Sequence, residues 1–357
     1  MSPPDSPPYR DAGPLAFDVD ATSSAGFARP VTLFGHPRRL YGNANLSIYV
    51  RQRCNAHCAF CVEELRPASR GVALARQRIA LDDDVTWLGR LDRVLAEVGD
   101  HVRSVSVTGG EPSRDPSLPA ILRRVGGLRH LRRTMTSNGS GLWLQREGRP
   151  VIEHVVHAGL DHLNLSRAHW DRDENARLMA MRGTVAEGGG LDDDAFAAAI
   201  ERAHAGGISV RLSCVLLREG VGSWEAIERY LDFAAAVGVR HVIFRELMRH
   251  DPERALPGGV ARYSDRERVA MRPLLARLDA EPAFRPKRQI VGYYYYVEVF
   301  ETRWRGHPMS VTFEAADLGR IEARRRLEPD LVHELIFHPS GELCSTWQPW
   351  DGRLGPP

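Results

Sequence analysis

Apolar positions along the middle of the chain follow two alternating patterns. Short apolar runs such as "LSIYVR" are typical of strands, and segments with apolar residues three and four positions apart are typical of amphipathic helices. The predicted strands cover residues 46–51, 104–107, 133–136, 161–166, 208–216 and 240–247. The predicted helices cover residues 82–99, 118–125, 151–159, 194–205 and a segment from 223 onward. Because parallel strands need crossover connections of this kind, the pattern predicts an α/β fold whose six parallel strands fit an open or partial barrel.

The segments before and after this core have other patterns. The N-terminal segment is rich in Pro, Gly and Ser with few periodic apolar positions, which predicts a tail or a loosely packed extension. After the core, a Pro- and Gly-rich linker precedes a helix that a capping box from Ser264 to Glu267 is expected to open. The expected units are a tail or extension at 1–40, the barrel at 43–250, a linker and helix at 251–285, and a strand-rich extension covering the barrel at 286–357.

Composition limits the compartment and the classes of binding partner that we expect for this protein. Of the 357 residues, 43% are hydrophobic and 26% are charged, and the 48 basic residues nearly balance the 46 acidic ones. No electrostatic footprint for nonspecific nucleic-acid binding is therefore expected. The N-terminal sequence lacks the basic and apolar regions of a signal peptide, and no run of about 18 uncharged apolar residues could span a membrane. We expect a cytoplasmic protein without nucleic-acid or membrane partners.

Three of the five cysteines, Cys54, Cys58 and Cys61, lie within eight positions directly after the first predicted strand. In a reducing cytoplasm such a cluster favours metal over a disulfide, and an odd total fits poorly with a disulfide framework. Ligands of parallel α/β folds collect at the carboxyl ends of strands, so this position favours a functional loop. Three thiolates can hold three irons of a four-iron cluster and leave the fourth open. Zinc, with His57 as a rival ligand, and inert buried thiols are the alternatives.

The pattern Cys-x-x-x-Cys-x-x-Cys, with Phe60 before the third cysteine, resembles the signature of the radical S-adenosylmethionine (SAM) superfamily. A second motif, "TGGEP", follows the second strand and is similar to the Gly-Gly-Glu motif of that family. Its two glycines allow a close backbone approach to a ligand, and Glu111 offers an anion for an ammonium group. A simple turn before Pro112 is the alternative. Over residues 43–250 the resemblance extends to the molybdenum cofactor A group, whose sixth strand is similar to "FRELM".

The resemblance implies a partial (β/α)6 barrel that holds a [4Fe–4S] cluster on the three clustered cysteines and binds SAM. The positions it assigns to SAM are Gly109, Gly110, Glu111, Asn138, Ser166, Arg167, Arg211 and Ser213. Ser and Asn side chains suit a ribose, and Arg can bind a carboxylate through two hydrogen bonds. A plain turn at Asn138 and a surface charge at Arg211 remain the alternatives.

The reaction that the resemblance implies is the reductive cleavage of SAM to methionine and a 5′-deoxyadenosyl radical, which abstracts hydrogen from the substrate. The cluster then needs a strongly reducing electron, so an electron donor such as flavodoxin or ferredoxin is expected. We expect a biosynthetic enzyme that acts on a small polar metabolite such as a sugar or nucleoside. Modification of a peptide or protein side chain and a non-catalytic iron–sulfur or zinc-binding module are the alternative functions.

Outside these motifs, two cysteines and an aromatic segment are further candidates. The chain lacks the additional cysteine sets that hold auxiliary clusters in related enzymes, and it ends without a Gly-Gly tail, which makes GTP cyclisation doubtful. Cys214 is expected to pack in the core. Cys344 is a candidate catalytic residue that lines the substrate pocket or donates a hydrogen atom. Tyr294, Tyr296 and Glu298 share one face of a predicted strand and are candidate substrate-binding residues, with a packed aromatic strand as the alternative.

Overall fold

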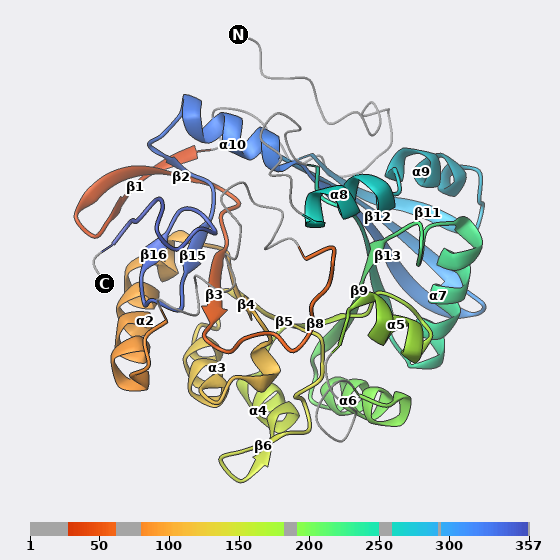
Figure 1. Ribbon diagram of the computed structural model, residues 1–357, viewed down its shortest axis with the longest axis horizontal. Coiled ribbons are helices and arrows are strands. Elements are labelled where there is room, and N and C mark those ends of the chain that lie inside the picture. The colour runs from red at the N-terminus through yellow and green to blue at the C-terminus, as the bar shows by residue number, and fades with distance from the viewer. Residues whose placement is uncertain (1–27, 62–79, 182–190, 250–258, 292–293, 356–357) are drawn as a thin grey trace.

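A single curved sheet is the framework of the computed structural model, which describes residues 28–61, 80–181, 191–249, 259–291 and 294–355. The sheet has eleven strands in the order β11-β12-β13-β10-β9-β8-β5-β4-β3-β15-β16. The expected six strands are β3 (Leu46–Val50), β4 (Ser104–Gly109), β5 (Arg132–Ser137), β8 (His162–Ser166), β9 (Ser209–Leu216) and β10 (His241–Glu246). They pair in parallel in chain order, and the sheet does not close (Figure 1). The prediction of an open or partial α/β barrel is therefore confirmed.

The C-terminal strands extend this sheet at both edges. At one edge, β13 (His307–Ala316) pairs in parallel with β10 and is followed by the antiparallel strands β12 (Tyr295–Trp304) and β11 (Phe284–Val291). At the other edge, β15 (Leu335–Phe337) pairs in parallel with β3 and carries the antiparallel β16 (Leu343–Cys344). The C-terminal residues thus enlarge the sheet itself.

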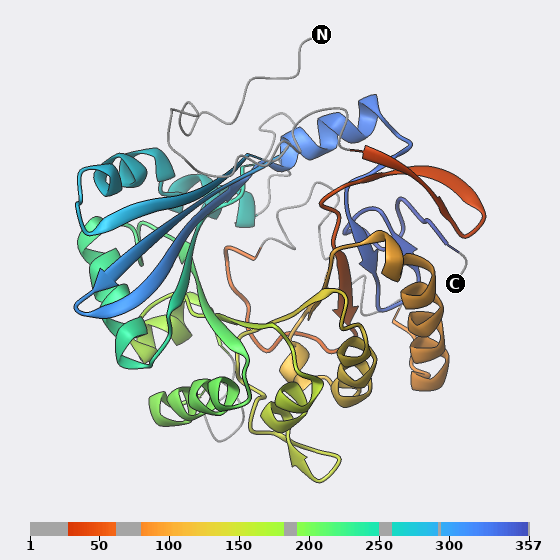
Figure 2. The same cartoon turned by 180° about the vertical axis from the view of Figure 1, so that it is seen from behind.

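Helices cover the outer, convex face of the sheet (Figures 1 and 2). The expected helices are α2 (Asp84–Val98), α3 (Leu118–Gly127), α4 (Val151–Ala158), α6 (Asp193–Ala205) and α7 (Trp224–Ala236). Side chains of Asp83, Asp192 and Ser223 accept hydrogen bonds from the first turns of α2, α6 and α7, as N-caps do. Helix α10 (Leu318–Leu327) was not predicted and lies across the open side of the curved sheet (Figure 1). Shorter elements are η4 (Gly99–His101), η5 (Pro112–Arg114), β6 (Gln145–Arg146), β7 (Arg149–Pro150) and α5 (Arg172–Leu178).

Alternation along the strands separates the two faces of the sheet. In β9, the side chains of Val210, Leu212 and Cys214 are fully buried, whereas those of Arg211 and Ser213 are only partly buried. Residues of the first set belong to the core that packs against the helices. Arg211 and Ser213 therefore point to the opposite, concave side, which we call the inner face.

The N-terminal segment differs from its prediction. Within its described part, β1 (Ala28–Leu33) and β2 (His36–Tyr41) form an antiparallel hairpin, and β2 pairs in parallel with β14 (Leu331–Val332). Leu33 and Leu40 are completely buried and belong to the main core. Residues 28–40 are thus packed and not a loose extension. The partner strand lies near the other end of the chain, where no local pattern could reveal it.

The predicted capping box is wrong. Ser264 lies inside α8 (Gly259–Glu267), Glu267 ends that helix, and α9 (Met271–Asp279) follows. The Glu267 carboxylate accepts a hydrogen bond from the backbone N–H of Glu219 at 3.0 Å and so joins another segment. The predicted linker lies almost wholly outside the described residues. No helix of the described ranges is long and apolar enough to cross a membrane.

Replacing Phe313 with Ala is expected to lower the free energy of unfolding by about 3–5 kcal/mol, because it leaves a cavity in the core. The Phe313 ring is fully buried, 5.3 Å from the Phe244 ring and 6.3 Å from the Phe300 ring between centroids, where β13 joins β10. Denaturant unfolding followed by circular dichroism measures the change. Val85→Ala, at a position that is 80% exposed, is the control. Equal stability of the two variants would show that the C-terminal strands unfold separately from the parallel strands.

Candidate functional site

The clustered cysteines lie in a loop that follows β3 at the carboxyl edge of the sheet. Cys54 and Cys58 are half-buried against a small apolar cluster formed by Ala56, Ala168, Leu178, Met179, Leu217, Leu247 and Tyr263. The backbone N–H of His57 donates hydrogen bonds to the carbonyl oxygens of Met179 and Ala180 at 3.1 and 3.2 Å. The loop is therefore anchored on the segment after α5, and an apolar layer shields its sulfur atoms.

Burial keeps the thiols of Cys54 and Cys58 neutral. Burial raises the pKa of Cys54 to about 11, with a further contribution from Glu111. Burial also raises the pKa of Cys58, and the neighbouring sulfurs of Cys61 and Cys54 raise it further. Three shielded sulfur ligands in one loop fit the requirements of an iron–sulfur cluster. In the part of the chain that the structure describes, no three His, Cys, Asp or Glu side chains are arranged to hold a single metal ion.

Gly110 brings the second motif directly against the cysteine loop. A β-carbon at Gly110 would lie 2.2 Å from the carbonyl oxygen of Gln52 and 2.7 Å from the backbone nitrogen of Cys54, so no side chain fits there. Gly109 has a φ of 127°, and a β-carbon there would lie 2.8 Å from the backbone nitrogen of Val50. Both glycines thus allow two loops from adjacent strands to pack backbone against backbone.

Glu111 connects this motif to the loop after β5. Its side chain is 1% exposed and accepts hydrogen bonds from the backbone N–H of Ser113 at 2.9 Å and the Ser113 hydroxyl at 2.6 Å. It also accepts hydrogen bonds from the Ser137 hydroxyl at 2.5 Å and the backbone N–H of Asn138 at 2.7 Å. Burial raises the pKa of Glu111, and these hydrogen bonds oppose that shift. Glu111 therefore positions two loops, and its expected role toward an ammonium group stays a prediction, since Oε2 accepts only the hydrogen bond from Asn138 among those described.

The loop after β5 reaches the cysteine loop through side-chain amides. Asn138 Nδ2 donates a hydrogen bond to Asn55 Oδ1 at 3.0 Å and lies 3.8 Å from the sulfur of Cys54. The Ser140 hydroxyl donates to the same Asn55 oxygen at 3.2 Å. The predicted residue Asn138 thus lies beside the cysteines, whereas Asn55 and Ser140 were not predicted. Asn55 directly follows Cys54, which is the signal that could have identified it.

Ser166, Ser213 and Arg211 lie on the inner face, as their alternation with buried residues requires. Ser166 of β8 is in register with Ser213 of β9, and Arg211 lies two residues deeper on β9. The Ser213 hydroxyl accepts a hydrogen bond from Arg245 Nε at 3.0 Å, and Arg245 Nη1 pairs with Glu314 at 2.8 Å. Arg245 was not predicted, because its pairing with Glu314 across the neighbouring strands β10 and β13 cannot be read from a local pattern.

Arg167 belongs to the outer face, which corrects the expectation that it contacts SAM. Its guanidinium group donates hydrogen bonds to the Trp170 carbonyl and the Asp193 carboxylate, each at 3.1 Å. The same group lies 4.9 Å from the ring centroid of Phe196 and 5.0 Å from that of Phe233. The side chain is buried and fixes the loop after β8 to α6 and α7.

The two remaining cysteines lie on opposite faces. Cys214 is fully buried in the core beneath the helices, which confirms its predicted role. Cys344 on β16 is also fully buried, and burial raises its pKa to about 12. Cys344 is in register with Ile336 on β15, and Ile336 is in register with Ser47 on β3. Residues in register lie on the same face of a sheet, so Cys344 lies on the inner face with Ser47. Its predicted catalytic role stays a prediction.

Tyr296 and Glu298 face the helices, which corrects the expectation that they bind substrate. They alternate along β12 on the same face as Phe300, whose ring contacts Phe313 in the helix-covered core. The Tyr296 hydroxyl donates a hydrogen bond to the Glu298 carboxylate at 2.9 Å, and both side chains are buried. Tyr294 precedes β12 and packs against the cluster of α10. The alternative, an aromatic strand packed in the core, describes Tyr296 and Glu298.

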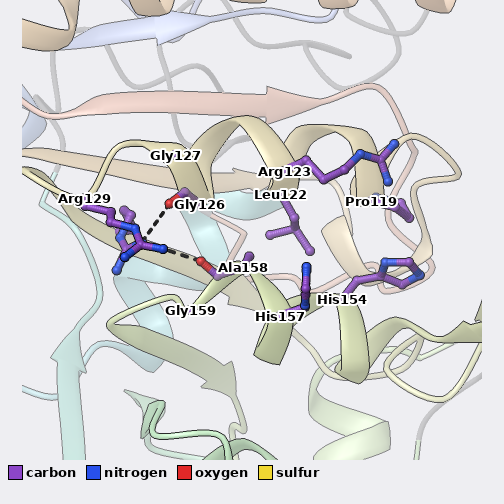
Figure 3. Close-up of a pocket in the computed structure, with 11 residues that line it drawn as sticks. Pro119, Leu122, Arg123, Gly126, Gly127, Arg129, His154, His157, Ala158 and Gly159 are labelled. Atoms are coloured by element: carbon purple, nitrogen blue, oxygen red, sulfur yellow. Dashed lines mark hydrogen bonds between the residues drawn. The ribbon is translucent and has the colours of Figure 1, made fainter.

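A pocket of about 570 Å³ lies elsewhere, between α3 and α4 on the outer surface (Figure 3). Gly126 and Ala158 line it where the two helices end, and Arg133 donates a hydrogen bond to the Gly126 carbonyl at 3.1 Å (Figure 3). None of the residues that line this pocket is a predicted site residue. It is therefore separate from the loops at the carboxyl edge.

Enzymes with parallel α/β sheets bind their ligands at the carboxyl edge, where this protein has three thiols packed on a glycine turn. The family model of the radical SAM superfamily matches residues 48–234, just over half of the chain. The chain therefore belongs to the radical SAM superfamily. It is an enzyme of that type, with the family's two cofactors, a [4Fe–4S] cluster and SAM. The zinc and non-catalytic alternatives are set aside by this membership.

Individual relatives match a smaller part of the chain. GTP 3′,8-cyclase 1 of Pseudomonas aeruginosa is 30% identical over 197 residues, 54% of this chain and 51% of the relative. The probable GTP 3′,8-cyclase of Metallosphaera sedula is 27% identical over 205 residues, 57% of this chain and 55% of the relative. The chain thus spans about half the length of these curated relatives. A radical SAM methyltransferase from Sphaerobacter thermophilus has a TM-score of 0.38 at 16% identity, over 64% of this chain and 62% of that structure.

Replacing Gly110 with Ala is expected to reduce iron binding several-fold, because the new methyl group would push the backbone of the cysteine loop away. Iron and sulfide content after anaerobic reconstitution measures the effect. Gly89→Ala is the matched control, since a β-carbon at Gly89 in α2 meets no atom within 4 Å. Full iron content in the Gly110→Ala protein would show that the loop tolerates displacement, and a loss in the Gly89→Ala protein would show a general defect.

Replacing Arg167 with Met is expected to lower the free energy of unfolding by about 2–3 kcal/mol, because charged hydrogen bonds to two segments are lost. The dissociation constant for SAM is expected to stay unchanged, since the guanidinium group lies on the outer face. Denaturant unfolding and calorimetric titration of the reconstituted protein measure the two quantities. Weaker SAM binding with an unchanged free energy of unfolding would show that Arg167 contacts SAM.

Proposed function

We propose that this radical SAM enzyme abstracts hydrogen from a small polar metabolite, such as a sugar or nucleoside, in a biosynthetic pathway. The observation that carries the proposal is the convergence of three loops at the carboxyl edge of the sheet. The cysteine loop, the glycine motif and the loop after β5 touch through Gly110 and through the Asn138–Asn55 hydrogen bond of 3.0 Å. When bound, the cluster supplies the electron that cleaves SAM to a radical able to abstract hydrogen.

In this proposal each loop has a separate task. Cys54, Cys58 and Cys61 hold three irons of the cluster, and the fourth iron is left for SAM. The backbones of Gly109 and Gly110, together with the side chain of Asn138, line the SAM site next to the cysteines. Glu111 orders these groups from behind through its four hydrogen bonds. The apolar cluster around Cys54 and Cys58 excludes water from the cysteine loop.

Beyond the cofactors, the inner face supplies polar groups for a substrate. Ser166 and Ser213 remain the proposed SAM contacts near the carboxyl edge, and Arg245 with Glu314 continues the polar surface toward a substrate on β10 and β13. The curated relatives are named GTP 3′,8-cyclases, so GTP is one candidate among polar metabolites. Cys344 remains a proposed hydrogen donor on the same side of the sheet.

Two further components belong to the proposal. An electron donor such as flavodoxin or ferredoxin reduces the cluster, since a strongly reducing electron is needed. We also place the enzyme in the cytoplasm, where thiols stay reduced and such donors occur.

Replacing any one of Cys54, Cys58 or Cys61 with Ala is expected to abolish cluster assembly or SAM cleavage, because each cysteine supplies one iron ligand. Iron and sulfide content and the formation of 5′-deoxyadenosine from SAM with a reductant, after anaerobic reconstitution, measure the loss. Cys214→Ala, which removes a thiol from the core, is the matched control and should keep both properties. A loop variant with wild-type iron content and wild-type SAM cleavage would refute the assignment.

A further inference from the structure

A row of polar side chains crosses the inner face below the residues assigned to SAM. Arg211 of β9 is in register with Asn164 of β8 and with His241 of β10, and Asn164 is in register with Thr136 of β5. Ser213 lies two residues nearer the carboxyl edge, a distance of about 7 Å along a strand. The Arg211 row is therefore deeper than the cofactor loops and in line with them.

Two buried atoms, one in this row and one just below it, have no hydrogen-bond partner among the described residues. Arg211 contacts Nε2 of His162, and within the described ranges it pairs with no carboxylate. Burial and the charge of Arg211 lower the pKa of His162 to about 4, so its imidazole is neutral and its remaining proton is on Nδ1. Nδ1 of His162 is buried without a partner. Oδ1 of Asn164 is also buried without a partner, although the Nδ2 of this residue donates to Thr136 at 3.3 Å.

The charges around Arg211 are mainly positive. Burial lowers the pKa of Arg211 to about 10, and the nearby cations Arg132 and Arg245 lower it further, while Glu314 acts in the opposite direction. Glu314 already pairs with Arg245 at 2.8 Å. A partly buried guanidinium without a counterion is unfavourable unless an anion joins it. The row therefore offers one cation, Arg211, and one carbonyl acceptor, Asn164 Oδ1, to a ligand.

We propose that Arg211 binds the anionic end of the substrate, a phosphate or carboxylate group. Oδ1 of Asn164, in register with Arg211, accepts a hydrogen bond from an adjacent hydroxyl of the ligand. This inference rests on the proposed function and narrows the small polar metabolite to an anionic, hydroxylated one. It also reassigns Arg211 from SAM to the substrate, whose uncharged part then extends past Ser213 toward the cofactors.

Calorimetric titration of the reconstituted full chain with three probes of one skeleton tests the proposal. Ribose 5-phosphate and ribonate carry the two anionic groups, and ribose carries neither. At least one anionic probe is expected to bind at least about tenfold more tightly than ribose, a difference typical of one charged hydrogen bond. The tighter of the two anionic probes identifies the group as phosphate or carboxylate.

Arg211→Gln is expected to weaken binding of the anionic probe by at least about tenfold and to leave the dissociation constant for SAM unchanged. Arg103→Gln is the matched control, because it removes the same charge from an exposed side chain outside the row. Asn164→Asp is a second variant that puts a carboxylate beside Arg211 in place of the ligand. It is expected to raise the melting temperature and to abolish binding of the anionic probes.

Three results would overturn the inference. Ribose could bind as tightly as both anionic probes, or Arg211→Gln and Arg103→Gln could weaken probe binding equally. Weaker SAM binding by Arg211→Gln with unchanged probe binding would assign Arg211 to SAM. Failure of the wild-type protein to cleave SAM would instead refute the proposed function alone, since probe binding is measured without turnover.

Discussion

The backbone contact between Gly110 and the segment from Gln52 to Cys54 is the constraint on which the site depends. Adjacent parallel strands end side by side, but the backbones of their following loops can approach this closely only where no β-carbon intervenes. At Gly110 this condition fixes the first cysteine against β4. The carboxylate of Glu111 then fixes β4 against the loop after β5, and Asn138 of that loop returns to the cysteine loop through Asn55. Each loop is thus held by the other two, with the apolar cluster behind them.

The polar residues singled out on the two faces of the sheet differ in their contacts. On the outer face, Arg167, Tyr296 and Glu298 are polar residues that the protein satisfies with its own atoms, and they fasten helices and strands. On the inner face, Arg211 pairs with no carboxylate of the described residues, and Oδ1 of Asn164 accepts no hydrogen bond from them. An unpaired buried polar group costs free energy. A buried charge or acceptor atom without a partner is therefore better evidence of a ligand than the residue type alone.

Much of the fold and of the cysteine loop could be predicted, because both are local. Strand and helix periods, N-caps and the spacing of Cys54, Cys58 and Cys61 are contained in short segments. The errors arose where distant segments decide the result. The face of β12 that Tyr296 occupies depends on pairing with β13, and Arg245 gains its role from Glu314 on that strand. For Arg167 the signal was present, since alternation with Ser166 already places the two on opposite faces.

Charge differs between the carboxyl edge, where the cysteine loop lies, and the deeper row around Arg211. Metal binding removes the protons that burial otherwise keeps on Cys54 and Cys58, and the thiolates then offset the positive charge of the irons at the carboxyl edge. The deeper row is cationic, with Arg211 near Arg132 and Arg245. An anionic ligand between the carboxyl edge and the row is attracted by the row, and partial burial strengthens this attraction. The field alone therefore favours one orientation, with the charged end deep and the uncharged carbon atoms toward the cluster. Hydrogen abstraction requires that same orientation, since the reacting carbon must face the cofactors.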